Sequence, residues 1–235
     1  MVKMNSISVV VPAYNEENDL RKSILTIQKY LSDLTNNNFE ILIIENGSAD
    51  NTPEIAKSLD KESSNIRSFC LKKASFAEAY RFGILHAKKE MVTLYPVDLA
   101  FSLNFIGRAY KLIDKYPIIL GVRFHESSKL DRPLIRILIS KIHTTLVNLL
   151  FKSNFNDVNC LKAFRTKIGK KLVSYTNAIG PFIEVELIYL IHKLNLRFIE
   201  IPVNHIEREL ARHPRYILKS VLKNFIDLFK YRLSI

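Results

Sequence analysis

The sequence of 235 residues is poor in cysteine and has no long uncharged hydrophobic run. Its two cysteines, Cys70 and Cys160, cannot build a disulfide framework, so we expect a reducing compartment. No run of eighteen uncharged apolar residues occurs, and a membrane-spanning helix is therefore not expected. The apolar stretch near the N-terminus is short and is followed by acidic residues, which does not fit a signal peptide.

Several common catalytic and metal-binding patterns are also missing. The sequence contains no Cys-x-x-Cys, no Gly-x-Ser-x-Gly and no phosphate-loop motif, and Ser48 has no neighbouring base. Six histidines are scattered without the spacing of metal ligands: His86, His125, His143, His192, His205 and His213. A nucleophilic serine enzyme and a histidine-based metal site are therefore not expected.

The composition is that of an ordinary globular protein, with 48% hydrophobic and 25% charged residues. The formal net charge is +12, and it is unevenly distributed. Residues 1–125 carry 16 basic and 14 acidic side chains, whereas residues 126–235 carry 19 basic and 9 acidic side chains. The basic excess favours an anionic partner for the second half. On charge alone, that partner is a nucleic acid, an anionic lipid or a phosphorylated substrate.

The first half alternates short apolar runs with helical patterns. Strands are predicted at residues 7–11, 40–44, 66–71 and 91–95, and helices at 17–34, 52–59 and 76–87. We expect Pro12 to end the first strand. Uniformly apolar strands separated by helices predict a parallel sheet covered on both faces. Ligands bind at the carboxyl ends of such strands, here residues 12–16, 45–50 and 96–100.

The second half is predicted to contain fewer strands and longer helices. Strands are expected at 117–122 and 198–203, and helices at 133–151, 182–194 and 214–233. The helices at 133–151 and 214–233 combine apolar spacing with basic residues. Such helices lie on a lipid surface when the apolar face is exposed, or pack on the core when it is covered.

Short motifs along the whole chain resemble a known enzyme family. In order, they are VVVPAYNEE (9–17), IIENGSADNT (43–52), AYRFGILHA (79–87), TLYPVDL (93–99), GVR (121–123), DVNCLKAFR (157–165), FIEVEL (182–187) and EIPVNHIER (200–208). This series is similar to glycosyltransferase family 2, in its dolichyl-phosphate mannose synthase-like branch. The resemblance implies an α/β GT-A fold with a mainly parallel sheet flanked by helices. It also implies a nucleotide-sugar-binding half at 1–125 and an acceptor-binding half at 126–235, within one domain.

The resemblance also implies where the nucleotide binds. Seven residues match the family's nucleotide-binding segments: Pro12, Ala13, Tyr14, Glu16, Glu45, Gly47 and Ser48. Exposed backbone and a carboxylate are suited to contact a base and a ribose. The alternative is that the first segment is only a turn after a strand, and that Asp50 caps a helix.

The metal motif of the family is altered in this sequence. The resemblance places its Asp-x-Asp at Pro96-Val97-Asp98, so only Asp98 remains as a carboxylate ligand. Mg²⁺ and Mn²⁺ sites often combine one or two carboxylates with substrate phosphates. We therefore expect Asp98 to hold a divalent cation weakly. Alternatively, Asp98 bonds the neighbouring backbone.

Two arginines match phosphate-binding positions of the family. These are Arg123 and Arg208, and a guanidinium suits this role through its planar fork of donors. A surface salt bridge is the alternative for Arg208. Glu184 and Glu186 match an acidic pair of the family, which pairs with basic residues or braces the helix. By resemblance, Asp98, Arg123 and Arg208 are the candidate catalytic residues.

The resulting hypothesis is an inverting transfer of a sugar to a polyprenyl or dolichyl phosphate. The donor would be a nucleotide-sugar of the GDP-mannose or UDP-hexose type. We expect the protein on the cytoplasmic face of the membrane, peripherally bound or attached to a membrane-embedded partner, without nucleic acid. The alternatives are a non-catalytic GT-A protein that binds a nucleotide-sugar or a partner, and a glycosyltransferase with a non-lipid acceptor.

Overall fold

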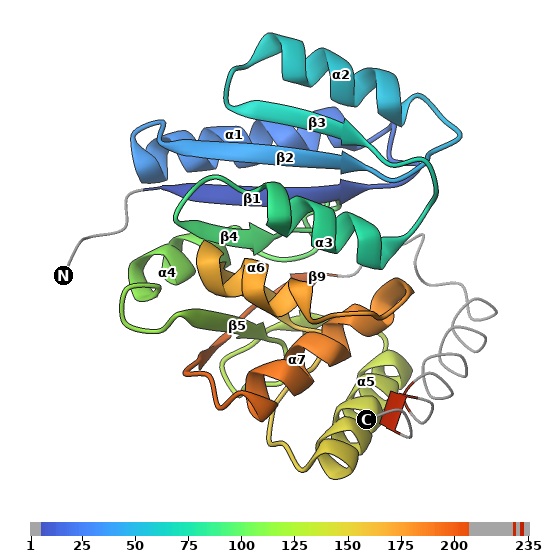
Figure 1. The fold of residues 1–235 in the computed structure, drawn as a ribbon, viewed down its shortest axis with the longest axis vertical. Helices are drawn as coiled ribbons and strands as arrows, with labels where there is room; N and C mark the ends of the chain where they lie inside the picture. The colour runs from blue at the N-terminus through green and yellow to red at the C-terminus, as the bar shows by residue number, and fades with distance from the viewer. Residues whose placement is uncertain (1–5, 207–227, 229–230, 233–235) are drawn as a thin grey trace.

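The computed structural model describes residues 6–206, 228 and 231–232. Seven strands form one sheet in the order β3-β2-β1-β4-β7-β5-β8 (Figure 1). They are β1 Ile7–Ala13, β2 Phe39–Glu45, β3 Ile66–Cys70, β4 Met91–Leu94, β5 Ile118–Val122, β7 Leu161–Arg165 and β8 Ile199–Pro202. Two short strands, β6 Leu130–Asp131 and β9 His205–Ile206, pair in a separate sheet.

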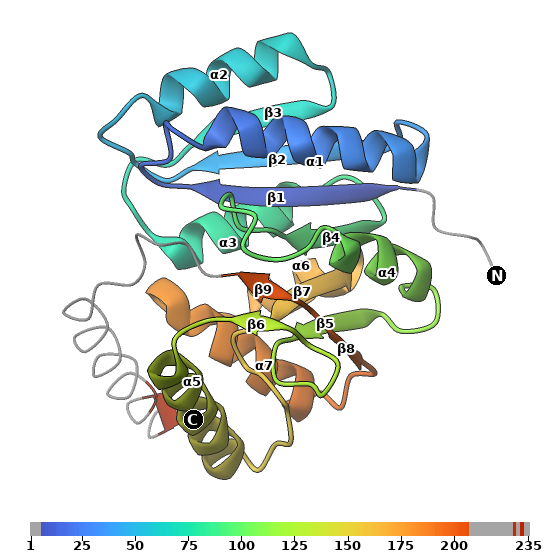
Figure 2. The ribbon, with the colours of Figure 1, turned by 180° about the vertical axis from the view of Figure 1, so that it is seen from behind.

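Helices cover both faces of the seven-stranded sheet, as expected from its uniformly apolar strands. They are α1 Leu20–Thr35, α2 Thr52–Glu62, α3 Phe76–His86, α4 Asn104–Leu112, α5 Leu134–Phe151, α6 Thr166–Ser174 and α7 Ile183–Lys193. A short 3₁₀ helix, η1 Gly180–Phe182, precedes α7. Helices α3, α6 and α7 lie on the face seen in Figure 1, and α1 and α4 lie on the face seen in Figure 2.

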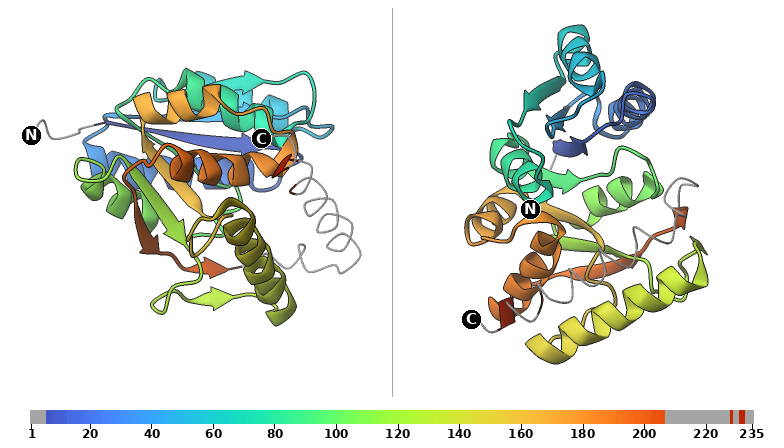
Figure 3. Two further views of the ribbon diagram at one scale, coloured as in Figure 1. Left: turned by 60° about the horizontal axis from the view of Figure 1, so that its bottom comes forward. Right: turned by 90° about the vertical axis from the view of Figure 1, so that its right-hand side faces the viewer.

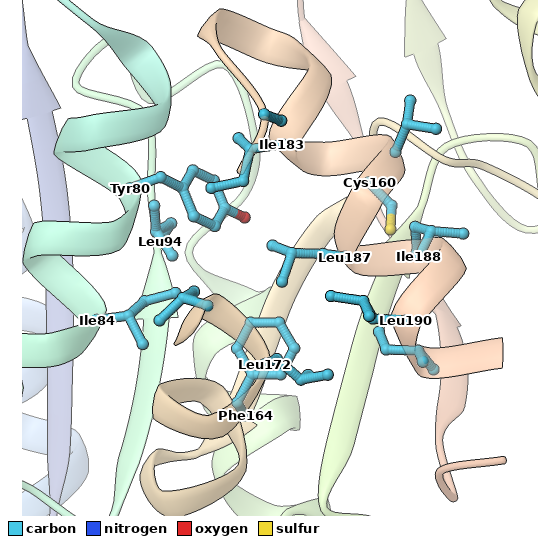
Figure 4. Packing of buried hydrophobic residues seen from close by; sticks show 14 of the residues in the cluster. Tyr80, Ile84, Leu94, Cys160, Phe164, Leu172, Ile183, Leu187, Ile188 and Leu190 are labelled. Carbon is cyan, nitrogen blue, oxygen red and sulfur yellow. The ribbon is translucent and has the colours of Figure 1, made fainter. Parts of the chain in front are cut away.

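The alternation of side chains along each strand divides the core into two layers. Val10 packs with residues of α3, α6 and α7, whereas its neighbours Val9 and Val11 pack with residues of α1, α2 and α4. Figure 4 shows the first of these layers, in which Tyr80, Leu172 and Leu187 come from three different helices. All seven residues of β2 are buried. The two layers hold the strand ends in fixed positions.

The predicted elements of the first half are confirmed, with small changes at their ends. One expectation is wrong, because Pro12 does not end the first strand and β1 continues to Ala13. The carbonyl of Val10 accepts a hydrogen bond from Tyr95 on the β4 side, so Pro12 faces the same side. The register with β4 extends only to Val10 and Leu94, so the missing N–H of Pro12 interrupts no ladder.

The largest departure from a simple parallel sheet is β7. This strand was not predicted, and it lies antiparallel between β4 and β5. Its presence agrees with a mainly parallel sheet, because the other neighbouring pairs in this sheet are parallel. Helices α4 and α6 were also not predicted. The helix expected at 214–233 lies almost entirely outside the described residues.

Helix α5 lies at the periphery of the fold (Figure 3). Its buried residues are His143, Thr144, Val147 and Phe151, which face the protein. By length and composition alone, the 18 residues of α5 would suffice to cross a membrane, with a mean hydropathy of 1.5 and 22% of the helix buried. Its two charged residues, Arg136 and Lys141, are the reason that the sequence shows no uncharged run of this length.

Candidate active site

A pocket lies at the carboxyl ends of β1, β2 and β4, where the parallel sheet predicted it. Its cavity volume is about 280 Å³, close to the lower limit for small-molecule sites. Five of the residues predicted from the sequence line it: Pro12, Ala13, Tyr14, Glu16 and Asp98. The strand ends that the motifs singled out therefore meet in one place.

The antiparallel direction of β7 adds a further wall to this pocket. Because β7 runs against β4, it begins at the edge where β4 ends. Leu161 and Lys162, at the start of β7, line the pocket together with Asn159 and Cys160. Tyr80 and Cys160 belong to the core layer in Figure 4 as well, so the pocket floor is continuous with the core.

Side-chain hydrogen bonds join the loops after β1 and β2. The amide of Asn15 donates to Ser48 Oγ at 3.0 Å, and the amide of Ala49 donates to Asn15 Oδ1 at 2.9 Å. Asn15 has a φ of 52°, a left-handed conformation that asparagine tolerates. Tyr14 beside it remains 51% exposed and lines the pocket. The joined loops thus present an accessible aromatic ring at the pocket.

Asp50 has a structural role beside the helix-cap position of α2, which Asn51 occupies. One oxygen of its carboxylate, Oδ1, accepts a hydrogen bond from the amide of Thr52, the first residue of α2, at 3.0 Å. The other, Oδ2, accepts from the amide of Glu17 at 3.2 Å. Asp50 therefore connects the start of α2 to the loop after β1.

In the turn after β2, the residue that lines the pocket is not one of those predicted from the sequence. Glu45 is buried, and its carboxylate accepts a hydrogen bond from the amide of Ser48 at 2.6 Å. Asn46 lines the pocket instead, while its Oδ1 accepts from the amide of Ser75. Gly47 has a φ of +72°, and a Cβ there would lie 3.1 Å from the backbone nitrogen of Ala74. Glu45, Gly47 and Ser48 shape this turn, and their predicted contact with a nucleotide stays a prediction.

The segment after β4 carries the altered metal motif. Asp98 and Pro96 both line the pocket, and one Asp98 oxygen accepts a hydrogen bond from the amide of Ala100 at 3.0 Å. Leu99, which lies between Asp98 and Ala100, has a φ of 51°. This left-handed conformation is unusual for leucine and costs energy. Within residues 6–206, 228 and 231–232, no group of three or more His, Cys, Asp or Glu is placed to hold a metal ion. The carboxylate of Asp98 therefore fits a cation that also binds a diphosphate. It does not fit a site in which the protein supplies every ligand.

Arg123 lies in a buried ion pair rather than at the pocket wall. Its Nε and Nη2 donate to the two carboxylate oxygens of Asp157, each at 2.8 Å, and its amide donates to Asp157 Oδ2. Burial lowers the pKa of Arg123, but the charge and hydrogen bonds of Asp157, together with the charge of Glu184, raise it overall. The predicted contact of Arg123 with a diphosphate stays a prediction, whereas its pairing with Asp157 is present. Arg208 lies outside the described residues.

Lys162 is a pocket residue that the sequence reasoning missed. Its side chain is fully buried, and its ammonium donates to the carbonyls of Val158 and Cys160 at 3.2 and 2.9 Å. Glu184, at the start of α7, also lines the pocket, with Oε1 at 3.9 Å from Lys162 Nζ. The signal in the sequence was a single lysine inside the otherwise apolar run Cys160-Leu161-Lys162-Ala163-Phe164.

Glu186, the second acid of the predicted pair, has a different role from Glu184. It is buried, and its carboxylate accepts hydrogen bonds from the amides of Asn177 and Ala178. It does not line the pocket of Tyr14 and Asp98. Of the acidic pair, Glu186 therefore braces the segment before α7, and Glu184 belongs to the pocket.

The substitution Arg123→Met tests the structural role of the buried ion pair. We expect the free energy of unfolding to fall by about 3–5 kcal/mol, because Asp157 would be left buried without its partner. Urea denaturation measures the change. Arg108→Met is the matched control, because Arg108 is exposed and donates only to the carbonyl of Pro202. Equal losses in the two variants would contradict a structural role for the Arg123–Asp157 pair.

Curated proteins with related sequences are glycosyltransferases. The chain is 28% identical to glycosyltransferase AglD of Haloferax volcanii over 210 residues, which covers 84% of this chain and 32% of that protein. It is 27% identical to a dolichyl-phosphate beta-glucosyltransferase of Dictyostelium discoideum over 217 residues, covering 86% of this chain and 66% of that protein. The chain thus spans about a third and about two thirds of these two relatives.

A solved structure with the same fold is glucosyl-3-phosphoglycerate synthase from Mycobacterium tuberculosis, in complex with Mn²⁺, uridine diphosphate and phosphoglyceric acid. It superposes with a TM-score of 0.67 at 18% identity, over 98% of this chain and 79% of that one. This likeness confirms the predicted GT-A fold. The sequence model of glycosyl transferase family 2 matches residues 8–173. The chain therefore belongs to glycosyl transferase family 2.

Proposed function

We propose that this protein transfers a sugar from a nucleoside-diphosphate donor to a polyprenyl phosphate. The observation that carries the proposal is the pocket in which Tyr14, Asn46 and Asp98 meet at three strand ends. Two supports come from the relatives. The Dictyostelium relative is named for glucosyl transfer to dolichyl phosphate, and the mycobacterial structure holds uridine diphosphate. We infer a uridine-diphosphate hexose as donor, with glucose as the first sugar to test.

The pocket offers distinct surfaces for the parts of this donor. Tyr14, whose ring is exposed, lines the pocket with Pro12 and Ala13, and we infer that these three residues contact the base. Asp98 lines the same pocket, and we infer that it would hold a divalent cation together with the diphosphate. A bound cation would supply charge neutralisation to the departing diphosphate.

The reaction is a displacement at the anomeric carbon of the sugar. An oxygen of the acceptor phosphate attacks this carbon, and the bond to the donor diphosphate breaks with inversion. The phosphate acceptor is already anionic at neutral pH, so it needs little help from a general base. The role of the protein is then to position both substrates and to exclude water from the reacting centre.

We infer that α5 attaches the protein to the membrane surface where such an acceptor lies. Five large apolar side chains of this helix are exposed by 45–83%: Leu134, Ile135, Leu138, Ile142 and Leu149. The opposite face packs on the protein through His143, Thr144, Val147 and Phe151, so lipid cannot surround the helix. A helix with one face on the protein and one apolar face outward fits an interfacial position.

Transfer itself is measured with purified protein, radiolabelled UDP-glucose and dolichyl phosphate in detergent. We expect a labelled glycolipid that mild acid releases as free sugar. GDP-mannose and a water-soluble phosphate acceptor are tested in parallel. Absence of transfer from every common donor, together with intact UDP binding, would favour the non-catalytic alternative, which the loss of a carboxylate at Pro96 motivates.

The role of Asp98 is tested by metal binding as well as by activity. Calorimetry should show Mn²⁺ binding only when UDP is present, because the protein supplies one carboxylate and the diphosphate supplies the other oxygens. Asp98→Asn should weaken Mn²⁺ binding to the UDP complex by at least tenfold. Glu54→Gln, an exposed acid on α2, is the control. Unchanged Mn²⁺ affinity in Asp98→Asn would remove Asp98 from the site.

Membrane attachment is tested by flotation with vesicles that contain phosphatidylglycerol. The double variant Leu138→Glu/Ile142→Glu should lose at least tenfold in vesicle affinity, because each apolar side chain contributes about 1.5–3 kcal/mol when buried in lipid. The matched control is Leu25→Glu/Leu85→Glu, whose leucines have a similar exposure of 45% and 44%. If both variants bind vesicles equally, α5 is not the attachment site.

A further inference from the structure

Four charged side chains form a buried cluster behind the pocket. Arg123 and Asp157 make one pair, and Lys162 and Glu184 make the other, with two positive and two negative charges in total. Three of the four side chains are almost inaccessible, with exposures of 7% for Arg123, 1% for Asp157 and 0% for Lys162. Glu184, at 21%, is the member that reaches the pocket.

The two pairs differ in how well they are satisfied. Arg123 and Asp157 are joined by two side-chain hydrogen bonds at 2.8 Å, so each compensates the other. Lys162 instead donates to two backbone carbonyls, and its ammonium lies 3.9 Å from Glu184, beyond hydrogen-bond distance. Among the described residues, no hydrogen-bond donor contacts the Glu184 carboxylate. Glu184 thus keeps its acceptor sites for a molecule in the pocket.

A buried ammonium is costly unless a nearby negative charge compensates it. The carbonyls of Val158 and Cys160 satisfy hydrogen bonds of Lys162 but carry no full charge. The carboxylate of Glu184 lies 3.9 Å from this ammonium, whereas Asp157 is already paired with Arg123. The position of Lys162 is therefore best explained by a requirement that Glu184 be ionised at the pocket wall.

We propose that Lys162 is a positioning residue that holds Glu184 as a carboxylate, and that Glu184 accepts hydrogen bonds from hydroxyl groups of the donor sugar. This inference rests on the proposed function, since it assumes that the pocket of Tyr14 and Asp98 holds the donor. Lys162 itself acts through Glu184 and does not contact the substrate. Hydrogen bonds from neutral donors to a charged acceptor are stronger than those between neutral groups, which suits recognition of a hydroxyl-rich ligand.

The charges around Glu184 predict a dependence on pH. Burial raises the pKa of Glu184 above its ordinary value overall, while Lys162 on β7 and Arg123 after β5 oppose this rise and Asp157 adds to it. Tyr80 on α3 and Cys160 also face it, and burial raises the pKa of both, so they stay neutral near pH 7. Removing the charge of Lys162 would raise the pKa of Glu184 further. More of the acid would then be protonated at neutral pH, and sugar recognition would recover only at higher pH.

The experiment compares binding of UDP-glucose and UDP by calorimetry between pH 5.5 and 9, with the wild-type chain and three variants. Glu184→Gln should weaken UDP-glucose binding about tenfold or more at neutral pH and leave UDP binding unchanged. Lys162→Met should shift the acidic loss of UDP-glucose affinity upward by about one pH unit or more, with UDP again unaffected. The double variant Lys162→Met/Glu184→Gln should match Glu184→Gln alone, because Lys162 acts through Glu184.

The double variant also guards against misfolding, since it leaves no unpaired buried charge in this pair. Glu186→Gln is the control from the same helix, because Glu186 does not line the pocket and should leave the ratio of UDP-glucose to UDP affinity unchanged.

The proposal is overturned if Lys162→Met weakens UDP and UDP-glucose equally at every pH, or if the double variant loses more than Glu184→Gln. If the wild-type protein binds UDP-glucose no better than the variants do, this proposal is overturned and the proposed function is not affected. Wild-type protein that binds neither ligand overturns the proposed function and, with it, this inference.

Discussion

The direction of one strand decides the chemistry of the pocket. Parallel strands β1, β2 and β4 bring three loops to one edge of the sheet, but those loops carry few cations. Because β7 runs antiparallel beside β4, its beginning lies at the same edge, and it brings Lys162 to the pocket wall. The end of β5 lies at this edge too, with Arg123 following it. A strand parallel to β4 at this position would have placed its first residues at the opposite edge.

Side-chain hydrogen bonds connect the loops after β1 and β2, which form the other wall of the pocket. Asn15, Ser48 and Ala49 tie the first loop to the second, and Asn46 ties the second loop to the start of α3. These hydrogen bonds lie at the surface or are only partly buried, and together they link each loop to its neighbour. Tyr14 and Asp98 are thereby presented from a rigid frame. This frame suits a reaction that depends on placing a diphosphate and an acceptor phosphate at fixed positions.

The altered metal motif is consistent with a pocket whose charge comes from several sources. Pro96 removes a carboxylate from the fourth strand end, whereas Glu184 supplies one from the opposite wall. Lys162 and Arg123 balance the negative charges behind that wall. The metal motif alone therefore describes this site incompletely. Asp98 follows β4, Lys162 lies on β7 and Glu184 lies on α7, and Arg123 follows β5 behind them.

Most of the first half could be predicted from the sequence, since periodicity alone sets the faces of its helices and strands. Its uniformly apolar strands indicated a parallel sheet, and the polar residues at their ends indicated the pocket edge. Local pattern could not show that Pro12 faces an unpaired side of β1, which depends on where β4 stops. It also could not show that Glu45 turns inward to the amide of Ser48 while Asn46 lines the pocket.

By itself, the sequence determined the class of fold and the edge of the sheet where ligands bind, because these follow from the hydrophobic pattern, and it indicated the family through the resemblance of its short motifs. Only the tertiary structure decided which charged groups share that edge. Arg123 and Asp157 are 34 residues apart in the chain, and α6 and η1 lie between Lys162 and Glu184. Their pairing depends on the direction and order of the strands, and in a low-dielectric interior a few ångströms decide whether a charge binds substrate or a neighbouring side chain.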